Sequence, residues 1–389
     1  MAALPKHIAW AKKRAPGFAK ILSRVNPSRI KSRKALAALP LTRKSDLVSL
    51  QKALPPLGGL NATAPAKLFV SPGPIHDMEG LGANWWRTAR GLFAGGFREG
   101  DVILNSYAYH FTPAGSMLET GAHALGCTVF PGGIGQTEQQ VEAIAALAPD
   151  GYVGTPSFLK IILEKADELG VKLPSLVKAL LSAEAFPPSM RDAFAARGIQ
   201  GYQAYATADL GCIAYETPAR EGLVVDEGVL VEIVRPGTGD PVAPGDVGEV
   251  VVTTLYNADY PLIRFGTGDL SAAMPGVSPC GRTNMRIKGW LGRADQRTKV
   301  KGMFVDPSQV AAIIRRHPEV TRARLVVDNS GGADRMTLHV EVADNASSRT
   351  EAIVESIRDV TKLRGDVAFH APGALPNDGK VIDDERKYT

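Results

Sequence analysis

Between residues 101 and 198, short apolar runs alternate with longer segments of helical periodicity, and this alternation limits the fold more than any other feature. Four apolar runs predict strands, at 101–107, 128–133, 151–156 and 177–186. Four longer segments predict helices, at 117–127, 138–149, 157–170 and 187–198. Because the connections are short, they favour a mostly parallel sheet with helices on both faces. The predicted fold class is therefore α/β.

The pattern changes near Gly222. Three strand-like segments follow with turn residues and no long helix between them, at 228–236, 248–255 and 261–272. They predict a small β subdomain over about 222–290. After Trp290, strands and helices mix again, which predicts a small α+β domain. The expected organisation is an N-terminal domain of residues 1–292 and a C-terminal domain of residues 293–389.

The N-terminal segment is strongly basic. It holds 12 lysines and arginines and no acid through Lys44, so the rest of the chain carries a net charge of about −7 against +5 overall. A contact with nucleic acid or a membrane, or an organelle-targeting segment, is one interpretation. A helical, solvated cap is the other, with four apolar residues facing the body of the protein: Ile8, Ala11, Ala15 and Phe18. Their helical spacing favours the cap.

Bulk composition indicates a soluble globular protein, with 44% hydrophobic and 22% charged residues. No apolar run approaches the roughly 20 residues that span a bilayer. The three cysteines, Cys127, Cys212 and Cys280, form no CxxC pair. A disulfide framework or a cysteine-rich zinc site is therefore not expected. The cysteine pattern instead favours a protein of the reducing cytoplasm.

One stretch raises the question of phosphate binding. Residues 68–80, LFVSPGPIHDMEG, read as the end of a strand and a turn leading into a helix, which we expect over residues 79–97. Enzymes often cradle phosphates where a strand gives way to a helix through a glycine-containing turn. Here two positions are proline, which has no N–H to donate. The stretch is either an altered phosphate loop or only a turn.

Common catalytic signatures are absent. The chain has no GxxxxGK[ST], no GxGxxG after a strand and no HExxH, and the region of Ser116 is not GxSxG. Five polar clusters stand at expected loop positions instead: SAE (182–184), YATADLG (205–211), YPLIRFGTGDL (260–270), GRADQRTKVKG (292–302) and LPNDGKVIDDERK (375–387). In this order they resemble the phenylacetate–CoA ligase family of the adenylate-forming superfamily, over nearly the whole chain. The resemblance implies the fold of an adenylate-forming enzyme.

The resemblance implies a nucleotide site for ATP. Glu184 would lie along the adenine and Tyr205 would stack on it, with Thr207 close by. Asp269 would accept hydrogen bonds from the ribose, and Arg293 would contact ribose or phosphate. The family's phosphate loop aligns with residues 70–80, where Ser71 and Gly73 are the only clear survivors.

It also implies catalytic and metal-binding roles. Asp209 stands where the family has an acid that helps to hold Mg²⁺, and a carboxylate suits that hard cation. Lys380 would neutralise charge on the α-phosphate and the acyl carboxylate as the adenylate forms, together with Arg293. Asp295 would be the hinge of the C-terminal domain. Each residue has a plainer interpretation as well: a helix cap for Asp209 and a solvated turn lysine for Lys380.

For the acid, the aromatic segment at Tyr109, His110 and Phe111 would line a slot for a flat, apolar substrate, with Gly135 near the pocket floor. A core packing cluster would look the same in sequence. The implied activity is that of an acid–CoA ligase that makes an acyl-adenylate with ATP and then a thioester with coenzyme A. No nucleic-acid partner is expected, and a homodimer is left open.

The loop at Ser71 departs furthest from the family. It lacks the usual lysine, and Asp77 would repel a triphosphate. Ala206 and Ala208 also replace a usual glycine and a common hydroxyl residue. A second hypothesis is therefore a non-catalytic or repurposed relative that binds nucleotide or acyl ligand without turning over ATP.

Overall fold

The computed structural model describes residues 1–71, 74–294, 296, 298–300, 303–329, 334–343 and 349–386. The chain divides into two compact units. The first unit contains Met1–Val231, Val252–Thr267 and Met274–Trp290; the second contains Glu232–Val251, Gly268–Ala273 and Leu291–Thr389. Gly73 and Asp295, which carry predicted roles, lie outside the described residues.

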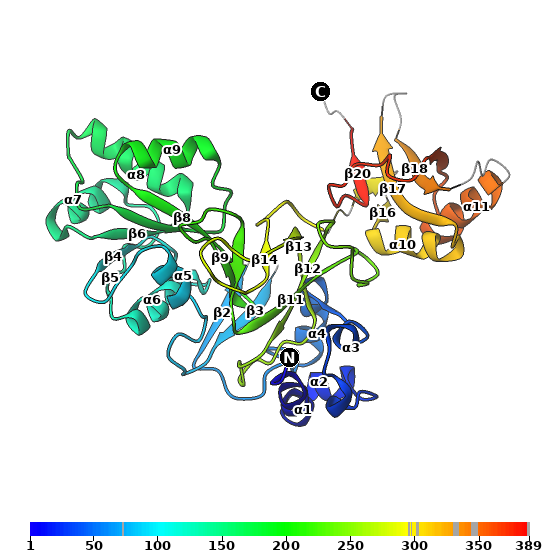
Figure 1. Cartoon of the computed structure of the whole chain (residues 1–389), viewed down its shortest axis with the longest axis horizontal. Coiled ribbons are helices and arrows are strands. Elements are labelled where there is room, and N and C mark those ends of the chain that lie inside the picture. Colours follow the sequence, from blue (N-terminus) through cyan, green and yellow to red (C-terminus); the bar gives the residue numbers. More distant parts are fainter. Residues whose placement is uncertain are drawn as a thin grey trace. The chain divides into compact units, whose positions relative to one another are not determined.

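The first unit is built on a parallel sheet. Its neighbouring strands lie in the order β8 (Gln200–Thr207), β7 (Lys178–Leu181), β6 (Gly151–Gly154), β4 (Val102–Asn105) and β5 (Thr128–Phe130). The connecting helices are α6 (Ala114–Leu125), α7 (Thr137–Leu147), α8 (Pro156–Glu168) and α9 (Pro188–Ala196). Helices α7, α8 and α9 lie on one face of the sheet, and α5 (Ala89–Ala94) and α6 lie on the other (Figure 1). This arrangement confirms the predicted α/β class.

Strand residues alternate between two apolar layers. Leu104, Tyr152 and Leu181 pack in the layer that contains residues of α7, α8 and α9. Their neighbours Ile103, Val153 and Leu180 pack in the layer of α5 and α6. Because successive side chains of a strand point to opposite faces, a strand covered on both faces is apolar at most positions. This is why the strands were recognisable as continuous apolar runs.

Beyond β8 the sheet becomes antiparallel. It continues through β9 (Gly211–Tyr215), β10 (Leu223–Val225) and β14 (Arg286–Ile287). Three further strands contain residues of both units: β11 (Val229–Val234), β12 (Val247–Thr254) and β13 (Phe265–Met274). The short strand β1 (Thr42–Arg43) pairs in parallel with β13. The described residues between β10 and β14 contain no helix, as the sequence predicts for that region.

The segment after Phe69 differs from its prediction. Residues Lys67–Ser71 (β2) and Ile75–Glu79 (β3) form an antiparallel hairpin, so the turn leads into a strand and not into a helix. Of the helix predicted over residues 79–97, only α5 is helical. Asn84 and Arg87 have positive φ angles of 51° and 62°, which a helix cannot contain. These bends allow Trp86 to be fully buried and to donate to Glu79 Oε2.

The basic N-terminal segment is helical. It comprises α1 (Leu4–Arg14), α2 (Pro16–Ile21), the 3₁₀ turn η1 (Pro27–Arg29), α3 (Arg33–Ala37), the 3₁₀ turn η2 (Lys44–Asp46) and α4 (Leu47–Ala53). All four residues of the predicted apolar face are buried: Ile8, Ala11, Ala15 and Phe18. The predicted helical form of this segment and its inward-facing apolar residues are therefore confirmed.

Helix α1 also carries a buried histidine that links stability to pH. His7 is 6% exposed, its Nε2 lies 3.2 Å from Thr254 Oγ1, and burial lowers its pKa from 6.5 to about 4. Below pH 6.5 the unfolded chain takes up a proton that the folded chain does not, so the free energy of unfolding falls as pH falls toward 4. Between pH 7 and pH 5 the wild type should lose about 2 kcal/mol more than His7→Gln. Urea unfolding at both pH values measures this. The exposed-site variant His110→Gln is the control and should behave as the wild type; equal losses in all three proteins would contradict the assignment.

The second unit contains a four-stranded sheet in the order β19 (Asp366–His370), β18 (Arg335–Val342), β17 (Val320–Asp328) and β20 (Ile382–Asp384). Helices α10 (Pro307–Arg316) and α11 (Thr350–Thr361) pack on one face through a common apolar core. A two-stranded ladder of β15 (Thr298–Val300) and β16 (Met303–Val305) precedes them. The mixture of strands and helices agrees with the predicted α+β character of this part of the chain. None of the described helices is long and apolar enough to cross a membrane.

Candidate active site

A cavity of about 300 Å³ opens in the first unit beside the carboxyl ends of the parallel strands. Its lining residues follow or end three of these strands: Tyr107 after β4, Leu180, Ser182 and Ala183 at β7, and Ala204, Ala206, Thr207 and Ala208 at β8. Side chains that leave parallel strands at this edge converge, which makes it the usual ligand site of α/β sheets. The topology therefore explains why the cavity is here.

Helix α6 supplies an apolar wall. Ala114, Met117 and Leu118 line the cavity, and their spacing of three and four residues puts them on one face of the helix. Thr112 and Pro113, just before the helix, also line it. The rest of the lining includes Lys44, Ser71 and Thr88, which bring a charge and two hydroxyl groups. Such a surface suits a mostly apolar ligand with one polar group.

Asp209 forms a buried ion pair at the edge of this region. Lys44 Nζ lies 2.6 Å from Asp209 Oδ2, and the Asp209 side chain is 1% exposed. The other oxygen, Oδ1, is buried and has no hydrogen-bond partner among the described residues. Asp77, buried nearby, accepts a hydrogen bond from Ser71. Burial, followed by the charge of Asp209, raises the pKa of Asp77 to about 7.

The unpaired oxygen of Asp209 bears on the predicted magnesium ion. A buried carboxylate oxygen without a donor is costly unless a cation or another ligand completes it. Mg²⁺ binds through one or two carboxylates plus substrate phosphates, and does not need a cage of protein ligands. Within the described part of the chain, no three His, Cys, Asp or Glu side chains form a group that could hold a metal ion. Asp209 therefore fits the predicted ion.

The predicted nucleotide residues of the first unit lie around the end of β8 and the loop after β7. Thr207 lines the cavity, and its Oγ1 accepts from Leu210 N at 3.3 Å. Tyr205 is buried, and its hydroxyl donates to Thr267 Oγ1 at 3.2 Å. Glu184 is exposed and directly follows Ser182 and Ala183 of the lining.

The predicted substrate residues are placed differently. Tyr109, His110 and Phe111 are not among the residues that line the cavity, although Tyr107 and Thr112 are. Tyr109 Oη accepts from Asn105 Nδ2 at 2.8 Å, and Phe111 is 75% exposed. Gly135 lies exposed in the turn before α7, with a φ of +72°.

Sequence reasoning missed the residues that do line the apolar wall. The spacing of Ala114, Met117 and Leu118 is visible in the sequence, and it would have identified one face of a helix that follows a strand. Lys44 had no such signal. Its approach to Asp209 joins residues 165 positions apart, which only the folded chain shows.

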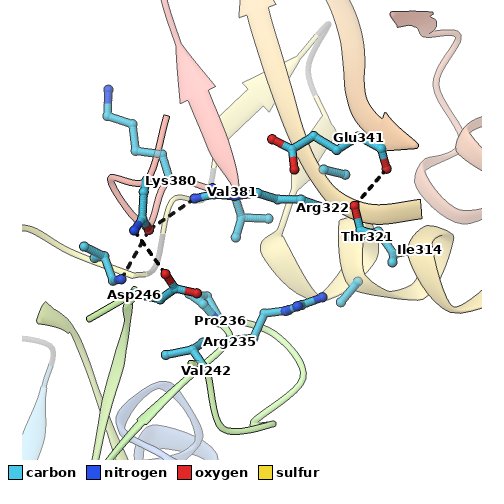
Figure 2. Close-up of a pocket in the computed structure, with 15 residues that line it drawn as sticks. Arg235, Pro236, Val242, Asp246, Ile314, Thr321, Arg322, Glu341, Lys380 and Val381 are labelled. Atoms are coloured by element: carbon cyan, nitrogen blue, oxygen red, sulfur yellow. Dashed lines mark hydrogen bonds between the residues drawn. The ribbon is translucent and has the colours of Figure 1, made fainter. Parts of the chain in front are cut away.

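The remaining predicted residues belong to the second unit. Arg293 Nη1 donates to Asp269 Oδ1 at 2.9 Å, and the two residues form an isolated antiparallel bridge. Lys380 lines a second cavity, of about 270 Å³, together with Arg235 and Arg322. In Figure 2 the amine of Lys380 points away from Arg235. It donates to Asp383 Oδ1 at 2.7 Å.

Comparison with known proteins agrees with this architecture. Residues 81–258 match the family profile described as AMP-binding enzyme. The phenylacetate-coenzyme A ligase of Thermus thermophilus is 31% identical over 360 residues, covering 88% of this chain and 80% of that protein. The corresponding enzyme of Aromatoleum evansii is also 31% identical, with coverages of 83% and 76%.

Among solved structures, a 2-hydroxyisobutyryl-CoA ligase in complex with 2-HIB-AMP superposes with a TM-score of 0.72 at 24% sequence identity. The match covers 99% of this chain and 88% of that one, and it confirms the predicted adenylate-forming fold. The ordered motifs, this fold and two relatives at 31% identity over most of their length lead to one conclusion. The chain belongs to the phenylacetate–CoA ligase family of AMP-forming ligases.

Proposed function

We propose that the protein is an acid–CoA ligase for an aromatic or similarly flat carboxylic acid. In the first step the substrate carboxylate attacks the α-phosphorus of ATP, and pyrophosphate leaves as the acyl-adenylate forms. In the second step the thiol of coenzyme A loses its proton and attacks the acyl carbon, and AMP leaves. Relatives that are CoA ligases support this activity over a non-catalytic role.

The apolar cavity is the observation that carries the proposal for the acid. Its volume of about 300 Å³ is at the lower end of the size range of small-molecule sites. Apolar side chains from α6 and the strand ends cover much of its surface, so a flat ring gains burial there while a short polar acid does not. The aromatic segment Tyr109–Phe111 is next to this wall in sequence and stays a proposed contributor.

The polar residues receive roles that fit their chemistry. Asp209 is proposed to hold Mg²⁺, which would supply charge neutralisation at the phosphates of ATP. Thr207 and Ser71 line the cavity. Thr207 is proposed to contact the nucleotide through its hydroxyl group, whereas the hydroxyl of Ser71 donates to Asp77. In the second unit, Asp269 is proposed to accept from the ribose, and Lys380 and Arg293 to offset charge that develops on the α-phosphate.

Exchange of labelled pyrophosphate into ATP tests this proposal, because it reports the first step alone. We expect phenylacetate and other aryl acids to support exchange, and acetate to support it poorly. If acetate exceeds every aryl acid tested, the aromatic substrate class is wrong. If no acid supports exchange while a non-hydrolysable acyl-adenylate mimic still binds, the non-catalytic hypothesis replaces this one.

Filling the cavity from α6 should separate acids by size. Ala114→Leu adds three carbon atoms to the wall, and we expect it to raise the KM of aryl acids about 5- to 150-fold, because overpacking costs about 1–3 kcal/mol. The KM of acetate should change less. His123→Leu, an exposed position nine residues along the same helix, is the matched control. Equal changes in KM for large and small acids would show that this wall does not contact the acid.

A further inference from the structure

Two arginines project from the sheet of the second unit toward the segment that carries Lys380. Arg322 and Arg324 on β17 are paired with Glu341 and His339 on β18. The alternate residues of these strands, including Leu325 and Leu338, lie in the apolar core. The arginines therefore occupy the face of the sheet opposite α10 and α11.

This face binds residues 375–378 through the main chain. Arg322 donates to Leu375 O at 3.2 Å and to Pro376 O at 2.9 Å. Arg324 Nη2 donates to Pro376 O at 3.1 Å. Glu341 Oε1 accepts from Leu375 N at 2.7 Å. Figure 2 shows Arg322 and Glu341 near the segment of Lys380 and Val381. Charged groups thus satisfy backbone atoms of the approach to Lys380.

Arg324 contacts both carboxylates that bind Lys380. Asp378 Oδ1 accepts the backbone N–H of Lys380 at 3.0 Å and also contacts Arg324 Nη2. Asp383 Oδ1 accepts the amine of Lys380 at 2.7 Å, and its Oδ2 lies 3.5 Å from Arg324 Nη1. The Arg324 side chain is 8% exposed, whereas that of Lys380 is 47% exposed. A buried guanidinium therefore lies between the two anions that determine where Lys380 points.

We propose that Arg324 is a positioning residue for Lys380. It fixes the backbone of residues 375–380, and it shares the charge of Asp383, so that the amine can leave this carboxylate for a substrate. Without Arg324, the only cation paired with Asp383 among the described contacts would be Lys380, which would then be held more strongly. This inference rests on the proposed catalytic role of Lys380.

Amide hydrogen exchange tests whether Arg324 fixes the backbone of residues 375–380, and it needs no assay of activity. In the full chain, Arg324→Ala should speed exchange of the Leu375 and Lys380 amides at least about tenfold, because the segment loses charge-assisted hydrogen bonds. Arg335→Ala is the matched control, since Arg335 on β18 pairs with Asp366 and both side chains are 62% exposed. It should leave these amides unchanged. Unchanged exchange in Arg324→Ala would overturn the proposal.

The rates of adenylate formation and of thioester formation test whether Arg324 positions the amine of Lys380. Arg324→Ala should slow adenylate formation at least about tenfold, the scale of one lost charged contact. Thioester formation from supplied adenylate should stay within about twofold, because Lys380 is assigned to the first step only. Arg324→Lys keeps the charge but cannot reach both carboxylates with one fork, so its effect should be intermediate. The Arg324→Lys variant also provides the test if Arg324→Ala does not fold.

Rescue separates positioning from a loss of structure. In Arg324→Ala with Asp383→Asn, the carboxylate that would hold Lys380 is gone, and we expect most of the adenylation rate to return. No recovery in the double variant would overturn the positioning role. Failure of the proposed function would look different, because the wild type itself would then form no adenylate with any acid. Failure of the role assigned to Lys380 would appear as adenylate formation by Lys380→Ala at the wild-type rate. If Lys380→Ala is impaired while Arg324→Ala is not, only the inference about Arg324 is lost.

Discussion

Replacing Lys380 by alanine should slow adenylate formation at least about 100-fold, which is the scale of losing one preorganised donor at a developing charge. The Lys380 side chain is 47% exposed and its amine is paired with the carboxylate of Asp383, so the side chain is accessible for such a role. Charge on the α-phosphate and acyl oxygens changes in the first step. In the second step the thiol of coenzyme A attacks the acyl carbon. The rate of thioester formation from supplied adenylate should therefore change much less.

Single-turnover measurements of each half-reaction test this expectation. Lys362→Ala is a suitable control, because Lys362 is an exposed lysine of the same unit that follows α11. It should leave both steps unchanged. An unchanged adenylation rate in Lys380→Ala would remove Lys380 from the mechanism. Equal losses in both steps would indicate a general structural effect.

The hairpin of β2 and β3 leads us to expect weak binding of ATP and comparatively tight binding of the adenylate. Pro72 and Pro74 offer no N–H, and no lysine follows them. The Ser71 hydroxyl is already donated to Asp77. Each missing charge-assisted hydrogen bond costs roughly 1.5–3 kcal/mol, or about 10- to 150-fold in affinity. The adenylate lacks the outer phosphates, so it does not suffer this loss.

Calorimetric titration of ATP with Mg²⁺, and of a non-hydrolysable acyl-adenylate mimic, compares the two affinities directly. We expect the mimic to bind at least about tenfold more tightly. Asp77→Asn removes a buried acid next to Ser71 and should strengthen ATP binding, while binding of the mimic stays the same. ATP that binds as tightly as the mimic would contradict this prediction. Other groups of the protein would then have to bind the outer phosphates, because the loop has no lysine and its two prolines have no N–H.

Much of the architecture could be predicted from local patterns. The strands 101–107 and 177–186 were recognisable because helices cover both faces of the sheet, and such strands are apolar at most positions. The hairpin at Ile75–Glu79 was not. Its polar residues His76 and Asp77 read as a stretch leading into a helix from Glu79, and only pairing with Lys67–Ser71 makes them a strand.

The sequence by itself determined the family, the α/β class and the order of motifs, because these depend on residue types at short spacings. The tertiary structure decided which of those residues meet. Lys44 reaches Asp209 from 165 positions away, and Ala114, Met117 and Leu118 of α6 line the cavity. Arg324 contacts Asp378 and Asp383, the two carboxylates that bind Lys380, from a strand more than 50 positions earlier in the chain. No local pattern encodes such contacts, because they arise when separate strands and loops pack against each other.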